Sequence, residues 1–310
     1  MNRFNLLVIN SALAIFMHVV TGRYYDTSRG RRLKTEQCYH TKFPQLDAGK
    51  VIIDTDAGAD DAAAIFMAIN KEKDNSSFKV IAITCVHGNT AVDNVVVNVF
   101  KILQTVGRLD IPVYRGASKS FIWTPPSDNY FGEDGFGDFE FPNPPNSSDL
   151  LQNEHAVNSL IQIVTQNPGE VTLLCLGPLT NVALAVRMDP TFLTKLKHLV
   201  VLGGSTEGVG NIKPGIEFNF YVDPEAAFIV FNSSDTSTGH IRPITLVPYD
   251  SVSERNIVTM VRRSKTYLMV CGSRSRSVNI IMQPINLKFS QTSLLTFPMQ
   301  RPKSYFHTDS

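Results

Sequence analysis

The chain has 310 residues, 43% of them apolar, which is enough for one large hydrophobic core or two small ones. Its net charge is +1, so it lacks the basic surplus of proteins that bind nucleic acid or an anionic membrane. The four cysteines are too few and too scattered for a disulfide scaffold or a zinc site. Cys85 and Cys175 lie in apolar runs and are predicted to be buried free thiols, whereas a bridge between Cys38 and Cys271 stays open.

The first 22 residues have the features of a secretory signal peptide. Arg3 precedes an apolar stretch from Leu6 to Met17, and the small residue Gly22 suits a cleavage site. A membrane anchor is the second interpretation, but the stretch is short for a membrane span. We therefore expect a secreted, extracellular protein that has no membrane attachment after cleavage. Three Asn-Ser-Ser sequons agree with secretion and predict a glycoprotein; they begin at Asn75, Asn146 and Asn232.

The rest of the chain divides into three parts. Residues 23–49 are polar and basic, and are expected to form a flexible lead-in. Residues 50–258 alternate strand-like with helix-like runs, which predicts an α/β domain with an open, mainly parallel sheet and helices on both faces, in a Rossmann-like arrangement. Residues 259–310 are polar and basic without such alternation, and are predicted to be a divergent C-terminal segment.

The expected elements follow one another along the domain. They are strands at 51–53, 78–86, 111–114, 171–176, 196–202 and 244–247, and helices at 62–69, 92–106, 154–166, 179–187 and 224–231. Asp223 before Pro224 predicts a helix start with Asp as the N-cap. Residues 115–150 are rich in Pro, Gly and aromatic residues, and are predicted to form a lid or a packed insertion.

Four carboxylates lie within eight residues directly after the first strand: Asp54, Asp56, Asp60 and Asp61. No Lys or Arg occurs between residues 51 and 70. Two like charges about 4 Å apart repel by about 4 kcal/mol at a realistic dielectric constant. A helix dipole offsets only about 0.3–1 kcal/mol per charge, so helix capping by solvated acids does not account for all four. The pattern predicts a hard cation bound by oxygen ligands.

A phosphotransferase of the haloacid-dehalogenase type is a second interpretation of the acidic cluster, because such enzymes also place Asp-x-Asp after a first strand. They usually continue with x-Thr, whereas here Ala57 and Gly58 follow and then two more acids.

Further polar residues follow the later strands, and the carboxyl ends of parallel strands meet at one edge of a sheet. They include His87–Thr90, Gly177–Asn181 and Gly203–Ser205. Thr180 and Asn181 are interpreted as ordinary turn or cap residues. Glu217 and Asn219 alternate with apolar neighbours, so both are expected on one side of an extended segment, where a carboxylate and an amide suit sugar hydroxyls.

The stretch Asp54-Thr-Asp56-Ala-Gly-Ala-Asp60-Asp61 resembles the N-terminal signature of the inosine–uridine-preferring nucleoside hydrolases. The resemblance continues in order through Gly88-Asn89, Leu176–Asn181, Gly203-Gly204 and Asn211–Ala227, and covers roughly residues 50–249. It implies a calcium-dependent N-ribohydrolase that splits a small-molecule nucleoside into free base and ribose. Members of this family are usually dimers or tetramers, so a homo-oligomer is implied by analogy alone.

The resemblance also implies roles for particular residues. Asp56 and Asp61 would ligate Ca²⁺ together with the backbone carbonyl of Leu176, and Asp56 would act as general base on the calcium-bound water. Asp54 would orient its neighbours. The ribose would be held by two groups: Asp60, Asn89 and Asn219 at the 2′- and 3′-hydroxyls, and Asn211 and Glu217 at the 5′-hydroxyl.

One motif of the family is missing. A late His-Asp pair supplies a further calcium ligand and a candidate acid for the leaving base, but residues 288–298 contain neither residue type. His307 and Asp309 have the wrong spacing and are expected in an exposed tail. The C-terminus either comes from an altered splice form or reading frame, or is a diverged end with weakened activity. The alternative function is therefore a catalytically impaired nucleoside- or calcium-binding relative.

Overall fold

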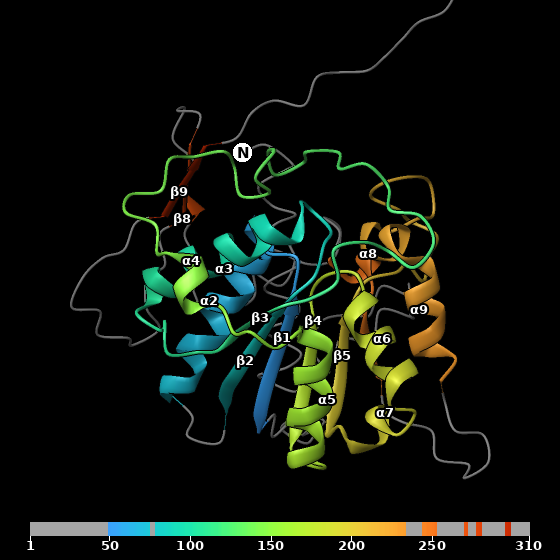
Figure 1. Cartoon of the computed structure of the whole chain (residues 1–310). Coiled ribbons are helices and arrows are strands. Elements are labelled where there is room, and N and C mark those ends of the chain that lie inside the picture. Colours follow the sequence, from blue (N-terminus) through green and yellow to red (C-terminus); the bar gives the residue numbers. More distant parts are fainter. Residues whose placement is uncertain are drawn as a thin grey trace, which may run out of the picture.

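The computed structural model describes residues 49–74, 78–233, 244–252, 270–271, 277–280 and 295–298. Its centre is a six-stranded sheet in the order β3-β2-β1-β4-β5-β6, in which every pair of neighbours is parallel (Figure 1). The strands are β1 (Lys50–Thr55), β2 (Lys79–Cys85), β3 (Val113–Arg115), β4 (Val171–Cys175), β5 (His198–Leu202) and β6 (Ile244–Val247). A separate antiparallel sheet contains β7 (Val270–Cys271), β8 (Ser277–Ile280) and β9 (Leu295–Pro298). The prediction of an open, mainly parallel sheet is confirmed.

Helices pack on both faces of the parallel sheet (Figure 1). They are α2 (Ala59–Asp74), α3 (Val92–Val106), α4 (Ser147–Leu150), α5 (Ala156–Gln166), α6 (Thr180–Met188), α7 (Phe192–Lys195), α8 (Phe218–Val222), α9 (Pro224–Phe231) and α10 (Tyr249–Val252). The bounds of α3 and α9 match the prediction, while α2 extends beyond residues 62–69 at both ends. The short helices were not predicted, because four or five residues cannot display a helical period.

The alternation of side chains along β1 builds two cores. Val51 and Ile53 join one cluster with residues of α2 and α3, whereas Ile52 joins the other with residues of α5, α6 and α9. All three side chains are fully buried. A strand that is covered on both faces has a continuous run of apolar residues in its sequence. The three β-branched residues Val51, Ile52 and Ile53 therefore suffice to predict this strand.

The strand order places a topological switch point beside β1. From β1 the chain continues to β2 and β3 on one side of the strand, and then crosses to β4 on its other side. Open α/β sheets bind their ligands at the carboxyl ends of the strands where the order reverses. The acidic cluster begins at Asp54, near the end of β1, and continues beyond the strand, and the Leu176–Gly177 segment follows β4, so both lie at this point.

The long segment between β3 and α4 contains no helix or strand, yet part of it belongs to the core. Phe136 is 2% exposed and packs in the same cluster as α2 and α3. By contrast, Ile122 and Trp123 are 78% and 57% exposed. A packed insertion, one of the two predicted forms, therefore describes the region around Phe136.

Several predictions concern residues outside the described ranges. These are the signal peptide, the lead-in up to residue 48, Cys38, the sequon at Asn75, and His307 with Asp309. Within the described ranges, no helix is long and apolar enough to cross a membrane. Cys85 and Cys175 are buried free thiols, as predicted. The side chains of Asn146 and Asn232 are exposed.

Candidate functional site

The four clustered carboxylates lie where β1 turns into α2. Asp54 is within β1, and Asp60 and Asp61 are in the first turn of α2. Ala57 adopts a left-handed conformation (φ 46°) that redirects the chain from strand to helix. Its N–H donates to Thr55 Oγ1 at 2.9 Å, and the Thr55 hydroxyl donates to Asp61. The turn is thus held by Thr55 together with Asp61, a member of the cluster.

Burial distinguishes this cluster from a set of solvated helix-capping acids. Asp54, Asp56 and Asp61 are 0%, 1% and 3% exposed. In the part of the chain that the structure describes, no ion pair with Lys or Arg involves any of the four acids. Burial raises the pKa of Asp54 and of Asp56 to about 7, and that of Asp60 to about 6. The pKa of Asp61 lies well above its usual range because of burial and the charges of Asp56 and Asp60.

Asp54 connects β1 to β2 and to α6 through hydrogen bonds. Its Oδ1 accepts hydrogen bonds from the Thr84 hydroxyl on β2 at 2.5 Å and from Asn181 Nδ2 on α6 at 2.8 Å. Asn181 Nδ2 also donates to the Cys85 carbonyl at 3.0 Å, and its Oδ1 accepts from the N–H of Ala117 at 2.8 Å. Asn181 is therefore a long-range connector, and its interpretation as a turn or cap residue is wrong.

Asp56 is enclosed by backbone from two strand ends. Its Oδ2 accepts a 2.8 Å hydrogen bond from the N–H of Asn89, which follows β2. A Cβ atom on Gly88 would lie 2.1 Å from Asp56 Oδ2, and one on Gly177, after β4, would lie 3.0 Å from Asp56 Oδ1. Both glycines therefore permit a close approach of the backbone to this carboxylate.

Asn219 links the ends of β4 and β5. Its Nδ2 donates to the carbonyl oxygens of Leu176 at 2.8 Å and Leu202 at 3.1 Å. The N–H of Leu176 donates to the carbonyl of Asp54 at 2.8 Å, so this segment is also tied to β1. The structure thus brings Leu176 and Asn219 together at the edge of the sheet that carries the acidic cluster.

Glu217 uses both carboxylate oxygens within the fold. Oε1 accepts from the N–H of Asn219 at 3.0 Å, and Oε2 accepts from those of Gly204 and Phe220 at 2.8 and 3.1 Å. Burial raises its pKa to about 7, against the opposing effect of these three donors. Glu217 is the N-cap of α8 and has an extended backbone, but Asn219 lies within α8, so the prediction of an extended segment that carries both residues is wrong. Asn211 is exposed, and its Oδ1 accepts from the N–H of Phe218 at 2.8 Å.

Two further sets of hydrogen bonds connect distant segments near the site, and the sequence does not predict them. Asp223 is the N-cap of α9, as predicted, but it also accepts a 2.6 Å hydrogen bond from the Thr180 hydroxyl. His87 Nε2 lies 3.0 Å from Ser120 Oγ, whose proton is donated to the Val222 carbonyl at 2.6 Å. Nε2 must therefore carry the proton, and burial lowers the pKa of His87. Nothing in the local sequence around Ser120 signals this contact.

The oxygen atoms at this edge of the sheet are of the type that binds a hard cation, but they are too few to complete its coordination. Among the described residues, no group of three His, Cys, Asp or Glu side chains is arranged to hold a metal. The Asp56 and Asp61 carboxylates and the Leu176 carbonyl, which the resemblance implies as ligands, lie at the same edge of the sheet, and their role as ligands stays a prediction. A calcium ion takes six to eight oxygen ligands, so these three groups alone would not complete its coordination. The buried Asp60 Oδ1 has no hydrogen-bond partner and adds another acceptor at the same edge.

The fold and the site define a parallel α/β protein with an oxygen-rich site at the switch point of its sheet, where buried carboxylates have no Lys or Arg partner among the described residues. The chain belongs to the inosine–uridine-preferring nucleoside hydrolase family, whose model matches residues 51–298. Enzymes of this family are metal-dependent. The match extends past residue 258, and a domain boundary at that residue stays a prediction.

Individual relatives agree with the family. The chain is 39% identical over 186 residues to uridine nucleosidase 1 of Arabidopsis thaliana, covering 59% of this chain and 53% of the relative. It is 37% identical over 187 residues to the inosine–uridine-preferring nucleoside hydrolase of Leishmania major, covering 60% and 57%. Among solved structures, a plant nucleoside hydrolase has a TM-score of 0.58 at 38% identity, covering 66% of this chain and 60% of that one. The matched part is less than two thirds of these relatives' own length.

Proposed function

We propose that the protein hydrolyses the N-glycosidic bond of ribonucleosides and releases free base and ribose, with Ca²⁺ as the required cation. One observation carries the proposal. Asp56 and Asp61 are buried close to each other at the sheet edge that also carries the Leu176 carbonyl, and no Lys or Arg of the described residues forms an ion pair with them. Burying such acids is costly unless a bound cation compensates them. Membership of the nucleoside hydrolase family supplies the substrate class.

Asp56, Asp61 and the Leu176 carbonyl would hold the cation. A bound divalent cation lowers the pKa of water and favours a nucleophile at neutral pH. Asp61 is fixed for this role by the Thr55 hydroxyl, and Asp56 by the N–H of Asn89. The two carboxylates also lie within hydrogen-bonding reach of each other, and a bound cation would replace that contact.

In the proposed reaction, the oxygen of water forms a bond to ribose C1′ while the bond from C1′ to the base nitrogen breaks. The bonding electron pair leaves with the base, which takes up a proton from solvent. Asp56 accepts the proton that the attacking water loses and then releases it to solvent, so that one water is consumed per nucleoside. Positive charge develops on the ribose ring as the bond breaks, and the ring of carboxylates stabilises that charge.

We assign the ribose 2′- and 3′-hydroxyls to Asp60, Asn89 and Asn219. Asp60 Oδ1 is a buried acceptor without a partner, and a hydroxyl donor would satisfy it. Asp60 Oδ1 and Asn89 Nδ2 both lie within 3 Å of the position that a Cβ on Gly58 would take, so the two groups face one small region. Asn211 and Glu217 are proposed for the 5′-hydroxyl. The lone pairs of Glu217 are already shared with three backbone donors, so it would accept one further bond at most.

A catalytically impaired nucleoside- or calcium-binding relative remains the second candidate. The absence of a His-Asp pair in residues 288–298 favours it, because that pair would add a calcium ligand and an acid for the leaving base. Losing the acid slows cleavage most for bases that are poor leaving groups. The haloacid-dehalogenase interpretation has no support, since the family that matches is a different one.

The test is direct. Purified protein is incubated with inosine, uridine and adenosine, with calcium or with a chelator, and free base and reducing sugar are measured. Calcium-dependent release from at least one nucleoside is expected. Calcium-dependent thermal stabilisation without any release would favour the binder, and phosphate release from a phosphomonoester would reopen the phosphotransferase interpretation.

We also propose that the mature protein is secreted and glycosylated. The features of residues 1–22 and the exposed Asn146 and Asn232 sequons support this proposal. Expression of the full chain in a secretory host, followed by N-terminal sequencing and glycosidase treatment, would test it; retention inside the cell with an intact N-terminus would contradict it.

A further inference from the structure

A segment rich in aromatic residues contacts the turn between β1 and α2, which carries the acidic cluster. We refer to residues 127–139, which include Tyr130, Phe131, Phe136 and Phe139, as the aromatic loop. A Cβ atom on Gly58 would lie 2.9 Å from Phe131 Cε2, 2.8 Å from Asp60 Oδ1 and 2.7 Å from Asn89 Nδ2. The Phe131 ring therefore lies against the same small region that we assign to the ribose. Ser127 Oγ donates to the Asn89 carbonyl at 3.0 Å, which adds a second contact.

The loop contains no helix or strand and consists of consecutive turns. Gly132, Gly135 and Gly137 all have positive φ angles, as do Asn129 and Asp138. Such a segment has little order of its own, so its position depends on what holds it. The position of Phe131 against Gly58 therefore depends on the contacts that the rest of the loop makes.

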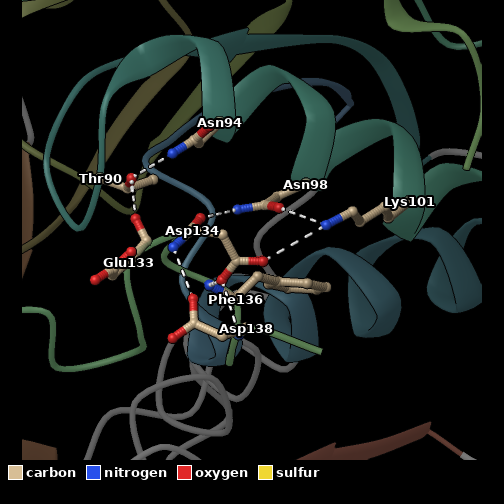
Figure 2. A network of polar contacts seen from close by, with 8 residues as sticks. All are labelled: Thr90, Asn94, Asn98, Lys101, Glu133, Asp134, Phe136 and Asp138. Atoms are coloured by element: carbon tan, nitrogen blue, oxygen red, sulfur yellow. Dashed lines mark hydrogen bonds and ion pairs between the residues drawn. The ribbon is translucent and has the colours of Figure 1, made fainter. Parts of the chain in front are cut away.

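Helix α3 holds the far side of the loop (Figure 2). Asn98, which is 1% exposed, donates through Nδ2 to the Asp134 carbonyl at 2.8 Å. Thr90 Oγ1 donates to the Glu133 carbonyl at 3.0 Å. Asp134 Oδ1 in turn accepts from the N–H groups of Phe136 at 2.7 Å and Asp138 at 3.0 Å, and so forms the turn itself.

Lys101 is the cation of this network. Its side chain is 11% exposed, and its Nζ lies 3.6 Å from Asp134 Oδ2 and 3.4 Å from Asn98 Oδ1. The same Nζ lies 5.8 Å from the ring centroids of Phe136 and Phe139. A buried ammonium group is costly and rarely kept unless it is paired, and here it is paired with the residue that shapes the loop.

We propose that Lys101 is a positioning residue for nucleoside binding: through Asp134 it fixes the aromatic loop against Gly58, beside Asp60 and Asn89. The role of the loop in binding a nucleoside rests on the proposed function, whereas the fixing of the loop does not. Lys101 lies on α3 and contacts neither Asp56 nor Asp61 in the structure, so it acts on the site only through the loop.

The test compares Lys101→Met, which keeps the apolar stem and removes the charge, with Arg108→Met. Arg108 follows α3 and pairs with Glu72 and Asp110, neither of which belongs to the aromatic loop. Arg108→Met therefore removes a partly buried cationic side chain without removing a contact to the loop, and serves as the matched control. For Lys101→Met, we expect KM for the cleaved nucleoside to rise about tenfold with kcat within about twofold, and calcium affinity to stay unchanged. Arg108→Met should change neither constant.

Misfolding does not mimic this result. A smaller folded fraction lowers the apparent kcat and leaves KM unchanged. Asp134→Asn should also raise KM, and the double variant should be no worse than Lys101→Met alone, because both substitutions remove the ion pair between Lys101 and Asp134. A fall in apparent kcat at constant KM, or additive effects in the double variant, would overturn the proposal.

Hydrogen exchange separates this proposal from the proposed function. Lys101→Met should speed amide exchange in residues 127–139 at least about fivefold and leave exchange in α5 unchanged. If the wild-type protein neither binds nor cleaves nucleosides, the proposed function fails and this measurement still decides whether Lys101 fixes the loop. Unchanged exchange in the loop would refute that role.

Discussion

The side-chain amide of Asn219 donates a 2.8 Å hydrogen bond to the carbonyl oxygen of Leu176. Asn219, which we propose binds the sugar, is thereby hydrogen-bonded to the Leu176 carbonyl, which we propose binds the cation. The two assignments come from segments 43 residues apart in the chain. The two binding events should therefore be coupled, because any group that moves Asn219 also changes the environment of the Leu176 carbonyl.

This coupling predicts two effects of Asn219→Ala. The variant leaves the Leu176 and Leu202 carbonyls without their donor, which frees the β4 end to move. We expect calcium affinity without nucleoside to fall severalfold and KM to rise about tenfold or more, since a lost hydrogen bond is worth about 1–2 kcal/mol. Isothermal titration with calcium measures the first effect. Calcium affinity equal to that of the wild type would show that the two sites are independent.

The two glycines that border Asp56 predict a graded response. Gly88→Ala would bring a Cβ to 2.1 Å from Asp56 Oδ2, so the carboxylate must move, whereas Gly177→Ala would bring one to 3.0 Å from Oδ1. We expect Gly88→Ala to abolish hydrolysis and Gly177→Ala to lower it only in part. Steady-state kinetics at saturating calcium compares them. Equal activity in both variants would contradict the placement of Asp56 between these backbone segments.

Glu217 predicts a pH dependence of stability in the chelated protein. Burial raises its pKa from 4.5 to about 7, so the folded state holds the proton more tightly than the unfolded state. Its contribution is therefore fully present below pH 4.5 and is lost as pH rises through 7, at a cost of about 3 kcal/mol. Glu217→Gln should have a melting temperature that changes less between pH 5 and pH 8. Parallel pH profiles for the two proteins would contradict this.

The fold and the position of the acidic cluster at the end of β1 could be predicted because their signals are local. The buried run Val51–Ile53 and the acids after it lie within a few residues of one another, and the bounds of α3 follow from its apolar period. The contacts of Asn181 could not be predicted, since Asp54 and Ala117 lie 127 and 64 residues away. The helical conformation of Asn219 could not be predicted, because α8, with five residues, is too short to show a helical period.

The central claim is that Asp56 serves both the cation and the hydrolysis, and Asp56→Asn tests it most directly. The variant keeps an oxygen that can accept from the N–H of Asn89 but loses the charge and the ability to take a proton. Base release from the nucleoside that the wild type cleaves best should be abolished, with calcium binding weakened in the same preparation. An unaltered rate of base release by Asp56→Asn would contradict the account.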